Sequence, residues 1–248
     1  MSVPTAPRSL FITATDTGVG KTVITGALLV AFQQQGEKVG VCKPIETGIH
    51  PQQEEQSDMA RLRQVCSPAP TPASICLYRY EPPLSPLACS RRIGSPINLT
   101  SILHHCQDLA RQHAITLIEG AGGLFTPLTP TQSILDLIKA LQVPCLVVGR
   151  TDLGAINHAL LTLRTLRQAG IPTHALVLNE SSPADKSLTA ISQRTSTVEL
   201  IRELVSAPIF GPIGYENTIQ SDWESGVRQL ARHQEIQRLV KSLACKGP

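Results

Sequence analysis

The stretch from Thr13 to Thr22 constrains the fold of this chain more than any other. It reads Thr-Ala-Thr-Asp-Thr-Gly-Val-Gly-Lys-Thr, follows the apolar run 10–12 and leads into the apolar segment 23–30. A buried strand, a glycine-containing loop and a helix opening at Gly-Lys-Thr present unpaired backbone N–H groups at the positive end of a helix dipole. Lys21 can reach the outer phosphates of a nucleotide there, and the Thr22 hydroxyl can ligate Mg²⁺. The stretch predicts a phosphate-binding P-loop rather than a chance Gly-Lys-Thr.

This loop departs from the ordinary motif in its length. The usual glycine position is taken by Thr15, and the nearest small residue, Ala14, lies one place farther from Gly20. The phosphate-binding loop is therefore longer by one residue.

The composition indicates a globular protein that stays in the cytoplasm. The 248 residues carry a formal net charge of +3 without a run of like charges, which argues against nucleic acid as the main partner. The seven cysteines are scattered and form no Cys-x-x-Cys pair, as expected for reduced, mostly buried thiols. We expect no signal peptide and no membrane span, and we expect residues 1–248 to form one domain.

Short apolar segments alternate with helical patterns along most of the chain. Because the strand segments are continuously apolar, they indicate a parallel sheet buried on both faces, hence a doubly wound, mostly parallel α/β fold with helices on both faces and ligands at the carboxyl ends of the strands. The polar stretch 46–57 is predicted to be irregular, and the proline-rich stretch 67–95 to be an ordered loop rather than a linker. After the first strand and helix, the predicted strands are 38–42, 114–119, 144–149, 174–178 and 208–213. Ser57 is predicted to cap a short helix over 58–63, and Asn98 to cap a helix that runs to about 112. The other predicted helices are 133–141, 156–168, 188–205 and 223–243.

Polar side chains follow the predicted strands and should converge at that edge of the sheet. Thr22, Asp58 and Glu119 supply hard oxygen ligands for Mg²⁺, although Asp58 could simply complement a helix dipole. Lys43 is unusual because an ordinary nucleotide hydrolase needs one lysine at the phosphates, not two. Unless Lys43 is a solvated strand-end lysine, it predicts a second anion held against the γ-phosphate, hence ATP-driven ligation through a mixed anhydride. The converging set is Thr15, Asp16, Thr17, Lys21, Thr22, Lys43, Thr47, Asp58 and Glu119 with the glycines after it.

At these motifs the chain resembles the dethiobiotin synthetase family, ATP-dependent enzymes that close the ureido ring in biotin biosynthesis. The resemblance runs from about residue 10 to 215 and is most specific in the lengthened P-loop and in the segment Lys-Pro-Ile-Glu-Thr-Gly at 43–48. Further matches are Ser57-Asp58, Glu119-Gly-Ala-Gly-Gly, Asn157-His-Ala-Leu-Leu-Thr, 82–86 and 211–215.

The resemblance implies a P-loop NTPase fold and a cyclo-ligase that forms carbon–nitrogen bonds. It implies that 7,8-diaminononanoate and CO₂ form a carbamate, that ATP phosphorylates it with Mg²⁺ as cofactor, and that the neighbouring amine closes the ring, releasing ADP and phosphate. Lys43, Lys21 and Thr17 would be catalytic, and Thr47 would help hold the carbamate. Nucleotide would contact Gly18, Val19, Gly20, Lys21, Thr22, Val23, Asp58, Glu119, Gly120, Ala121, Gly122, Asn179, Gly214, Tyr215 and Glu216.

The resemblance also implies a homodimer. In the family the carboxylate tail of the substrate is caught across the dimer interface at a helix start, which Gly154, Ala155, Ile156 and Asn157 match here. His158 follows them, and we expect a buried histidine satisfied by hydrogen bonds rather than a general base.

Two departures and two alternatives accompany the resemblance. Ala14 stands where the family has glycine, and Glu180 where an aspartate is common. A partition or positioning ATPase of the deviant P-loop group, acting on membrane or DNA, is the main alternative, but its signature lysine falls at Asp16. The synthetase half of a cobyrinate-type amidotransferase would require a glutaminase, for which no segment remains.

Overall fold

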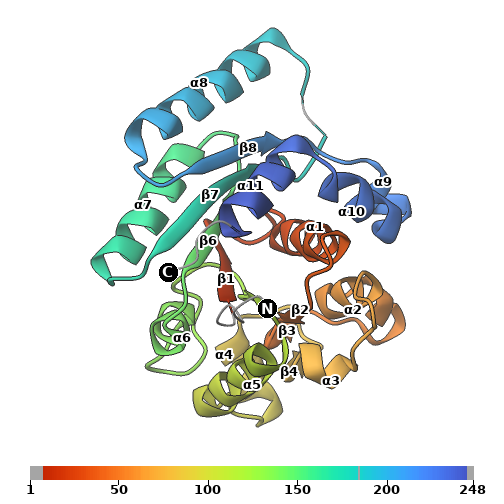
Figure 1. Ribbon diagram of the computed structural model, residues 1–248. Coiled ribbons are helices and arrows are strands. Elements are labelled where there is room, and N and C mark those ends of the chain that lie inside the picture. Colours follow the sequence, from red (N-terminus) through yellow and green to blue (C-terminus); the bar gives the residue numbers. More distant parts are fainter. Residues whose placement is uncertain (1–7, 184, 245–248) are drawn as a thin grey trace, which may run out of the picture.

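A six-stranded sheet forms the centre of the computed structural model, which describes residues 8–183 and 185–244 (Figure 1). The strand order is β2-β5-β1-β6-β7-β8, and every neighbouring pair in this sheet is parallel. The predicted parallel α/β fold is confirmed. The strands are β1 (Arg8–Ala14), β2 (Val39–Cys42), β5 (Ile115–Glu119), β6 (Cys145–Gly149), β7 (Thr173–Asn179) and β8 (Ile209–Ile213).

Two hydrophobic cores cover the two faces of this sheet. In β1, Leu10 and Ile12 point into one core and Phe11 into the other, as the two-residue period of a strand requires. The first core contains buried residues of α1 (Lys21–Gln34), α2 (Asp58–Gln64), α9 (Thr218–Ser221), α10 (Trp223–Ala231) and α11 (Gln234–Ala244). The second contains those of α4 (Pro86–Ile93), α5 (Leu99–Gln112), α6 (Ile134–Leu141), α7 (Ala155–Gln168) and α8 (Leu188–Leu204).

Side-chain caps fix the starts of several helices where the sequence predicted them. The Ser57 hydroxyl accepts a hydrogen bond from the Ala60 N–H at the start of α2, and Asn98 accepts one from the Ser101 N–H at the start of α5. Ser133 and Asp136 form a capping box at the start of α6.

The proline-rich stretch is ordered, as predicted, but it is more regular than a loop. It contains α3 (Pro72–Ile75), β4 (Tyr78–Tyr80) and α4. The expectation of an irregular stretch at 46–57 is wrong in part, because β3 (Ile45–Thr47) pairs in parallel with β4 and η1 (Pro51–Gln56) is a 3₁₀ helix. Both strands of this small sheet have only three residues, too few to give a periodic pattern.

The predicted helix 223–243 is wrong as a single element. The chain forms α10 and α11, with a break at Arg232 and His233. The His233 ring nitrogen accepts a hydrogen bond from the Glu235 N–H, and the Glu235 carboxylate accepts one from the Gly211 N–H of β8. These contacts start a new helix that turns back over the sheet.

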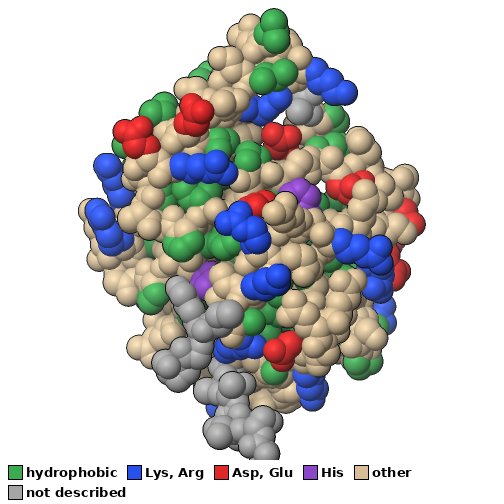
Figure 2. Space-filling model, turned by 45° about the horizontal axis from the view of Figure 1, so that its top comes forward, with side chains coloured by type: hydrophobic (Ala, Val, Ile, Leu, Met, Phe, Trp, Pro, Cys, Tyr) green, Lys and Arg blue, Asp and Glu red, His purple; other side chains and the backbone are tan. Residues whose placement is uncertain are grey.

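The surface charges are mixed and the described cysteines are mostly buried, as the composition led us to expect. On the visible part of the face in Figure 2, basic and acidic side chains are interspersed. No helix in the described ranges is long and apolar enough to cross a membrane. The described cysteines are free; Cys66 is partly exposed and the other five, at positions 42, 76, 89, 106 and 145, are buried. Cys245 lies outside the described residues.

Close packing between α9 and α10 leaves no space for a side chain at Gly226. A Cβ atom there would lie 2.6 Å from the Ile219 backbone nitrogen and 2.8 Å from its Cα. We expect Gly226→Ala to lower the free energy of unfolding by about 1–3 kcal/mol, measured by urea denaturation. Gly214→Ala, whose Cβ meets no atom within 4 Å, is the control and should change it by less than about 0.5 kcal/mol. Equal effects of the two variants would refute this packing argument.

Candidate active site

The loop between β1 and α1 has the backbone of an anion-binding nest. Gly18 and Gly20 adopt positive φ values of 74° and 96°, and α1 begins immediately afterwards at Lys21. Asn179, at the end of β7, donates a hydrogen bond of 2.9 Å from Nδ2 to the Val19 carbonyl. A Cβ atom on Gly20 would lie 2.2 Å from that nitrogen, so only glycine fits. Asn179 thus braces the loop, and its recognition of adenine stays a prediction.

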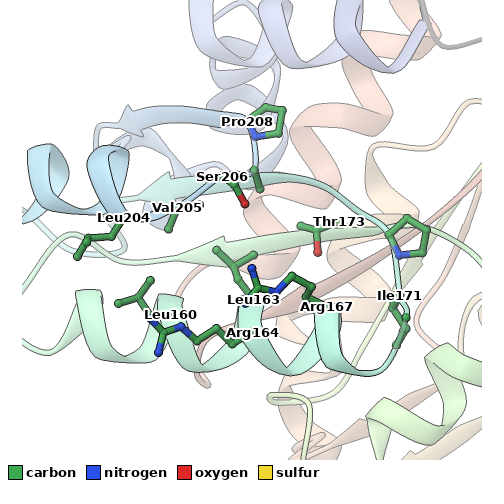
Figure 3. A pocket seen from close by; sticks show the side chains of 13 residues that line it. Leu160, Leu163, Arg164, Arg167, Ile171, Thr173, Leu204, Val205, Ser206 and Pro208 are labelled. Atoms are coloured by element: carbon green, nitrogen blue, oxygen red, sulfur yellow. The ribbon is translucent and has the colours of Figure 1, made fainter.

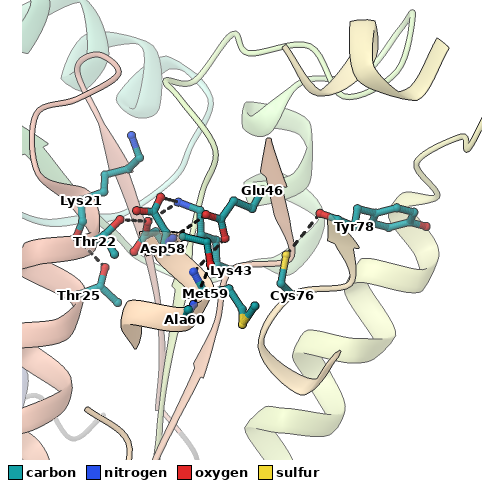
Figure 4. A network of polar contacts seen from close by, with 12 residues as sticks. Lys21, Thr22, Thr25, Lys43, Glu46, Asp58, Met59, Ala60, Cys76 and Tyr78 are labelled. Atoms are coloured by element: carbon teal, nitrogen blue, oxygen red, sulfur yellow. Dashed lines mark hydrogen bonds and ion pairs between the residues drawn. The ribbon is translucent and has the colours of Figure 1, made fainter. Parts of the chain in front are cut away.

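The centre of the site is the buried Lys43 ammonium (Figure 4). Lys43 follows β2, and its Nζ donates to the Glu119 carboxylate at 2.7 Å and forms an ion pair with Asp58. The Thr22 hydroxyl donates to the same Glu119 oxygen at 2.8 Å. Lys43 is 4% exposed and Glu119 is fully buried. Lys43 is therefore buried and is not a solvated strand-end lysine. The three predicted metal ligands, Thr22, Asp58 and Glu119, lie around it.

These oxygen atoms suit a hard divalent cation. The second Glu119 oxygen, Oε2, is buried and has no hydrogen-bond partner within residues 8–183 and 185–244. A carboxylate oxygen left unpaired in the interior is costly unless a cation or water meets it. In this part of the chain no three His, Cys, Asp or Glu side chains could hold a metal by themselves, so hydroxyl, phosphate or water oxygens would complete the sphere.

Opposing charges set the protonation of the site. Burial works against the Lys43 ammonium, but the carboxylates of Glu119 and Asp58 hold the pKa of Lys43 well above its ordinary value. Burial likewise works against the Asp58 carboxylate, yet Lys43 holds the pKa of Asp58 below its ordinary value. Burial and the neighbouring Lys43 lower the pKa of Lys21 to about 8. A bound anion, such as a phosphate group, would therefore stabilise the charged form of Lys21.

A cavity of about 300 Å³ lies over this network. Ile45, Glu46, Arg61 and Trp223 complete its wall, and none of the four was given a role from the sequence. The Trp223 indole donates to the Arg61 carbonyl at 2.7 Å, and the Arg61 guanidinium lies 5.2 Å from the indole centroid. Predicted residues on the wall are Thr17, Gly18, Gly20, Lys21, Thr22, Val23, Lys43, Thr47, Asp58, Ala121 and Gly122.

Comparisons with known proteins identify the family. A family model described as an AAA domain matches residues 8–222. Over 178 residues the chain is 40% identical to the ATP-dependent dethiobiotin synthetase BioD of Anaeromyxobacter sp. (strain K), covering 72% of this chain and 79% of that protein. The chain belongs to the dethiobiotin synthetase family. The BioD of Bacillus thuringiensis (strain Al Hakam) is 36% identical over 202 residues, 81% of each chain.

Solved structures share the fold of this family member at low sequence identity. The MinC:MinD cell division protein complex of Aquifex aeolicus gives a TM-score of 0.60 at 15% identity, covering 96% of this chain and 94% of that one. The septum site-determining protein MinD from Pyrococcus horikoshii, complexed with Mg-ADP, gives 0.58 at 15% identity with the same coverage. Both confirm the P-loop NTPase fold, and at 15% identity they show the fold alone.

The residues that the family resemblance assigns to the substrate tail and to the base lie outside the walls of the Lys43 cavity. Gly154, Ala155, Ile156 and Asn157 form the start of α7, where Gly154 has a φ of 90°. Gly214, Tyr215 and Glu216 follow β8, and the Glu216 carboxylate accepts a hydrogen bond from the Thr218 N–H. Their predicted roles in binding the substrate tail and the base therefore stay predictions, because these residues do not line the Lys43 cavity.

Two predicted residues, Asp16 and His158, lie outside the Lys43 cavity. Asp16 pairs with Arg150 at 2.5 Å, at the end of β6. The expectation of a buried, satisfied His158 is wrong: His158 is half-buried, and its Nδ1 has no hydrogen-bond partner among the described residues. His158 lines a cavity of about 450 Å³ with Thr15 and Phe125. A cavity of about 520 Å³ between α7 and the connection from α8 to β8 contains no predicted site residue (Figure 3).

The lowered pKa of Lys21 makes the stability of the ligand-free protein depend on pH. Between pH about 8 and 10.5 the folded state has released a proton that the unfolded chain still binds, so the free energy of unfolding rises with pH. Below pH 8 the buried ammonium costs up to about 3 kcal/mol. At pH 7 we expect the free energy of unfolding of Lys21→Met to exceed that of wild type by up to about 3 kcal/mol. This difference in free energy should become smaller toward pH 10. Urea denaturation at both pH values tests this, and a constant difference would contradict it.

Proposed function

We propose that this chain is an ATP- and Mg²⁺-dependent dethiobiotin synthetase. It carboxylates 7,8-diaminononanoate with CO₂ and closes the cyclic urea, giving dethiobiotin, ADP and phosphate. The family membership supports the reaction, and the observation that carries it is the second buried lysine: Lys43 lies on the wall of the P-loop cavity together with Lys21. Two cations at one cavity suit a reaction that holds an anionic co-substrate against the γ-phosphate.

In this proposal the carbamate is bound by Thr17, Lys21, Lys43 and Thr47, which share the wall of the cavity. A carbamate oxygen attacks the γ-phosphorus, the bond to the β-phosphate oxygen breaks, and ADP leaves. Lys21 and Lys43 stabilise the negative charge that develops on the transferred phosphoryl group. The amine on the neighbouring carbon then attacks the carbonyl carbon and phosphate departs. Because both amines belong to one substrate, ring closure is intramolecular and gains from orientation.

Thr22, Asp58 and Glu119 would hold the Mg²⁺. Bound there, the ion supplies charge neutralisation at the β- and γ-phosphate oxygens. The unpartnered Glu119 Oε2 supports this assignment. Lys43 contacts both carboxylates, and it holds the pKa of Asp58 below its ordinary value.

A homodimer in which each chain forms one domain completes the proposal. The start of α7 carries Gly154–Asn157, and the apolar side chains beside it are exposed: Leu153 by 85% and Leu161 by 58%. Phe125, 70% exposed, lies with Leu161 on the neighbouring cavity. Exposed apolar groups of this kind favour contact with a second copy, where a helix start suits the substrate carboxylate.

The switch ATPase alternative has the fold likeness to MinD in its favour. Against it, Asp16 stands at the place of the signature lysine and is paired with Arg150. ADP release by the purified protein separates the two functions. A synthetase needs ATP, Mg²⁺, 7,8-diaminononanoate and bicarbonate together and produces dethiobiotin. Hydrolysis that ignores the diamine, or that appears only with DNA or lipid, would overturn the proposal in favour of the switch.

Replacing Lys43 separates ligation from nucleotide binding. We expect Lys43→Gln to reduce kcat by at least about 100-fold, because an electrostatic partner of the transition state is lost. ADP affinity should stay within about threefold, since the P-loop keeps Lys21. Trp223 is the one tryptophan of the chain and lines the cavity, so its fluorescence can report nucleotide binding.

Lys139→Gln, an exposed lysine on α6, is the matched control and should leave both quantities unchanged. A thermal unfolding curve verifies that Lys43→Gln is folded, because removing one partner from a buried ion pair destabilises the protein. Turnover by the folded variant within about tenfold of wild type would remove Lys43 from the proposed chemistry.

A further inference from the structure

Glu46 is a buried carboxylate to which neither the sequence motifs nor the proposed function gives a role. It lies in β3 beside Thr47 and is 6% exposed. Its Oε1 accepts a hydrogen bond of 2.6 Å from the Asp58 N–H, and its Oε2 accepts one of 2.9 Å from the Met59 N–H (Figure 4). Both donors belong to the first turn of α2.

These contacts occupy the part of a helix that normally lacks partners. The first four N–H groups of a helix have no intrahelical acceptor. Ser57 satisfies the Ala60 N–H, and Glu46 satisfies those of Asp58 and Met59. Burial raises the pKa of Glu46, while Lys43 and the two N–H groups favour its ionised form. Hydrogen bonds from neutral donors to a carboxylate are stronger than those between neutral groups, so this is a firm attachment of α2 to β3.

The hydrogen bonds of Glu46 indicate attachment to α2 rather than direct catalysis, although the residue also lines the Lys43 cavity. Each of its carboxylate oxygens accepts a backbone N–H of α2, so its hydrogen bonds fix the helix. One of those N–H groups belongs to Asp58, whose own carboxylate pairs with Lys43. Glu46 therefore reaches the metal position through its hydrogen bond to the Asp58 N–H, and its charge also acts on Lys43.

We propose that Glu46 is a positioning residue that fixes the first turn of α2, so that the Asp58 carboxylate faces Lys43 and the proposed metal position. The same contact ties β3, which carries Thr47, to the helix that carries Asp58. The segment proposed to bind the carbamate, which carries Thr47, is thus held at a fixed position relative to Asp58, the proposed metal ligand. This inference depends on the proposed function only for the role of Asp58 at Mg²⁺.

The test measures the Mg²⁺ concentration that half-saturates ADP binding, followed by Trp223 fluorescence, and separately kcat at saturating Mg²⁺. We expect Glu46→Ala to raise the half-saturating concentration about tenfold, with kcat recovering to within about threefold. Glu46→Gln, whose amide retains one acceptor oxygen, should show a smaller shift and serves if the alanine variant fails to fold. Asp58→Asn gives the reference effect of a damaged ligand.

Two comparisons distinguish positioning from mere helix stability. Ser57→Ala removes a cap of the same helix without touching the Asp58 N–H, and should change the Mg²⁺ requirement less than twofold. In Glu46→Ala/Asp58→Asn the two shifts should not multiply, because both changes act on one ligand. An equal shift in Ser57→Ala, multiplicative shifts in the double variant, or no shift in Asp58→Asn would each overturn the inference.

The binding readout keeps this inference apart from the proposed function. If the wild-type protein makes no dethiobiotin but the Mg²⁺ shifts follow the expected pattern, the proposed reaction fails and the role of Glu46 stands. If dethiobiotin forms normally and Glu46→Ala and Glu46→Gln leave the Mg²⁺ requirement unchanged, the role of Glu46 fails and the proposed reaction stands.

Discussion

The ion network of Lys43 with Asp58 and Glu119 is the interaction on which the site depends. Isolated, each of these charges would be too costly to bury. Together they offset one another, and the Thr22 hydroxyl adds a hydrogen bond to Glu119. Removing Lys43 would leave both carboxylates without their cation, with Glu119 in a low dielectric. The network therefore holds three separate segments of the chain at one place: the end of β2, the end of β5 and the start of α2.

Sheet topology makes this meeting possible. β5 lies between β2 and β1, so the residues that follow β2 and end β5 arrive beside the P-loop that follows β1. The second edge of β1 pairs with β6, and β7 beyond it delivers Asn179 to the Val19 carbonyl. Short-range sequence features thus place the functional groups at strand ends or at helix starts. The strand order then decides which groups meet, as in other doubly wound sheets whose ligands bind at the carboxyl edge.

Most of the polar cluster could be predicted because strand ends and phosphate loops leave local signals. Thr22, Lys43, Asp58 and Glu119 were named from their positions after apolar runs or at a cap, and they lie in one cluster. Glu46 lies in the matched segment 43–48 but was given no role, since a glutamate in a short polar stretch has no periodic context. Trp223 and Arg61 are 162 positions apart in the chain, and no local pattern links them. His158 was misjudged because burial at a helix start depends on neighbours that the sequence does not specify.

The sequence by itself determined the parallel α/β class, the helix starts at Ser57, Asn98 and Ser133, and the phosphate-binding loop. These follow from apolar runs, side-chain caps and glycine positions, which act over a few residues. Only the tertiary structure decided the β3–β4 pairing, the break between α10 and α11, and the attachment of Glu46 to α2. Each of these joins elements whose own segments are too short or too ambiguous to fold alone. Their conformation is fixed by the partner they pack against, and that partner is chosen by the fold.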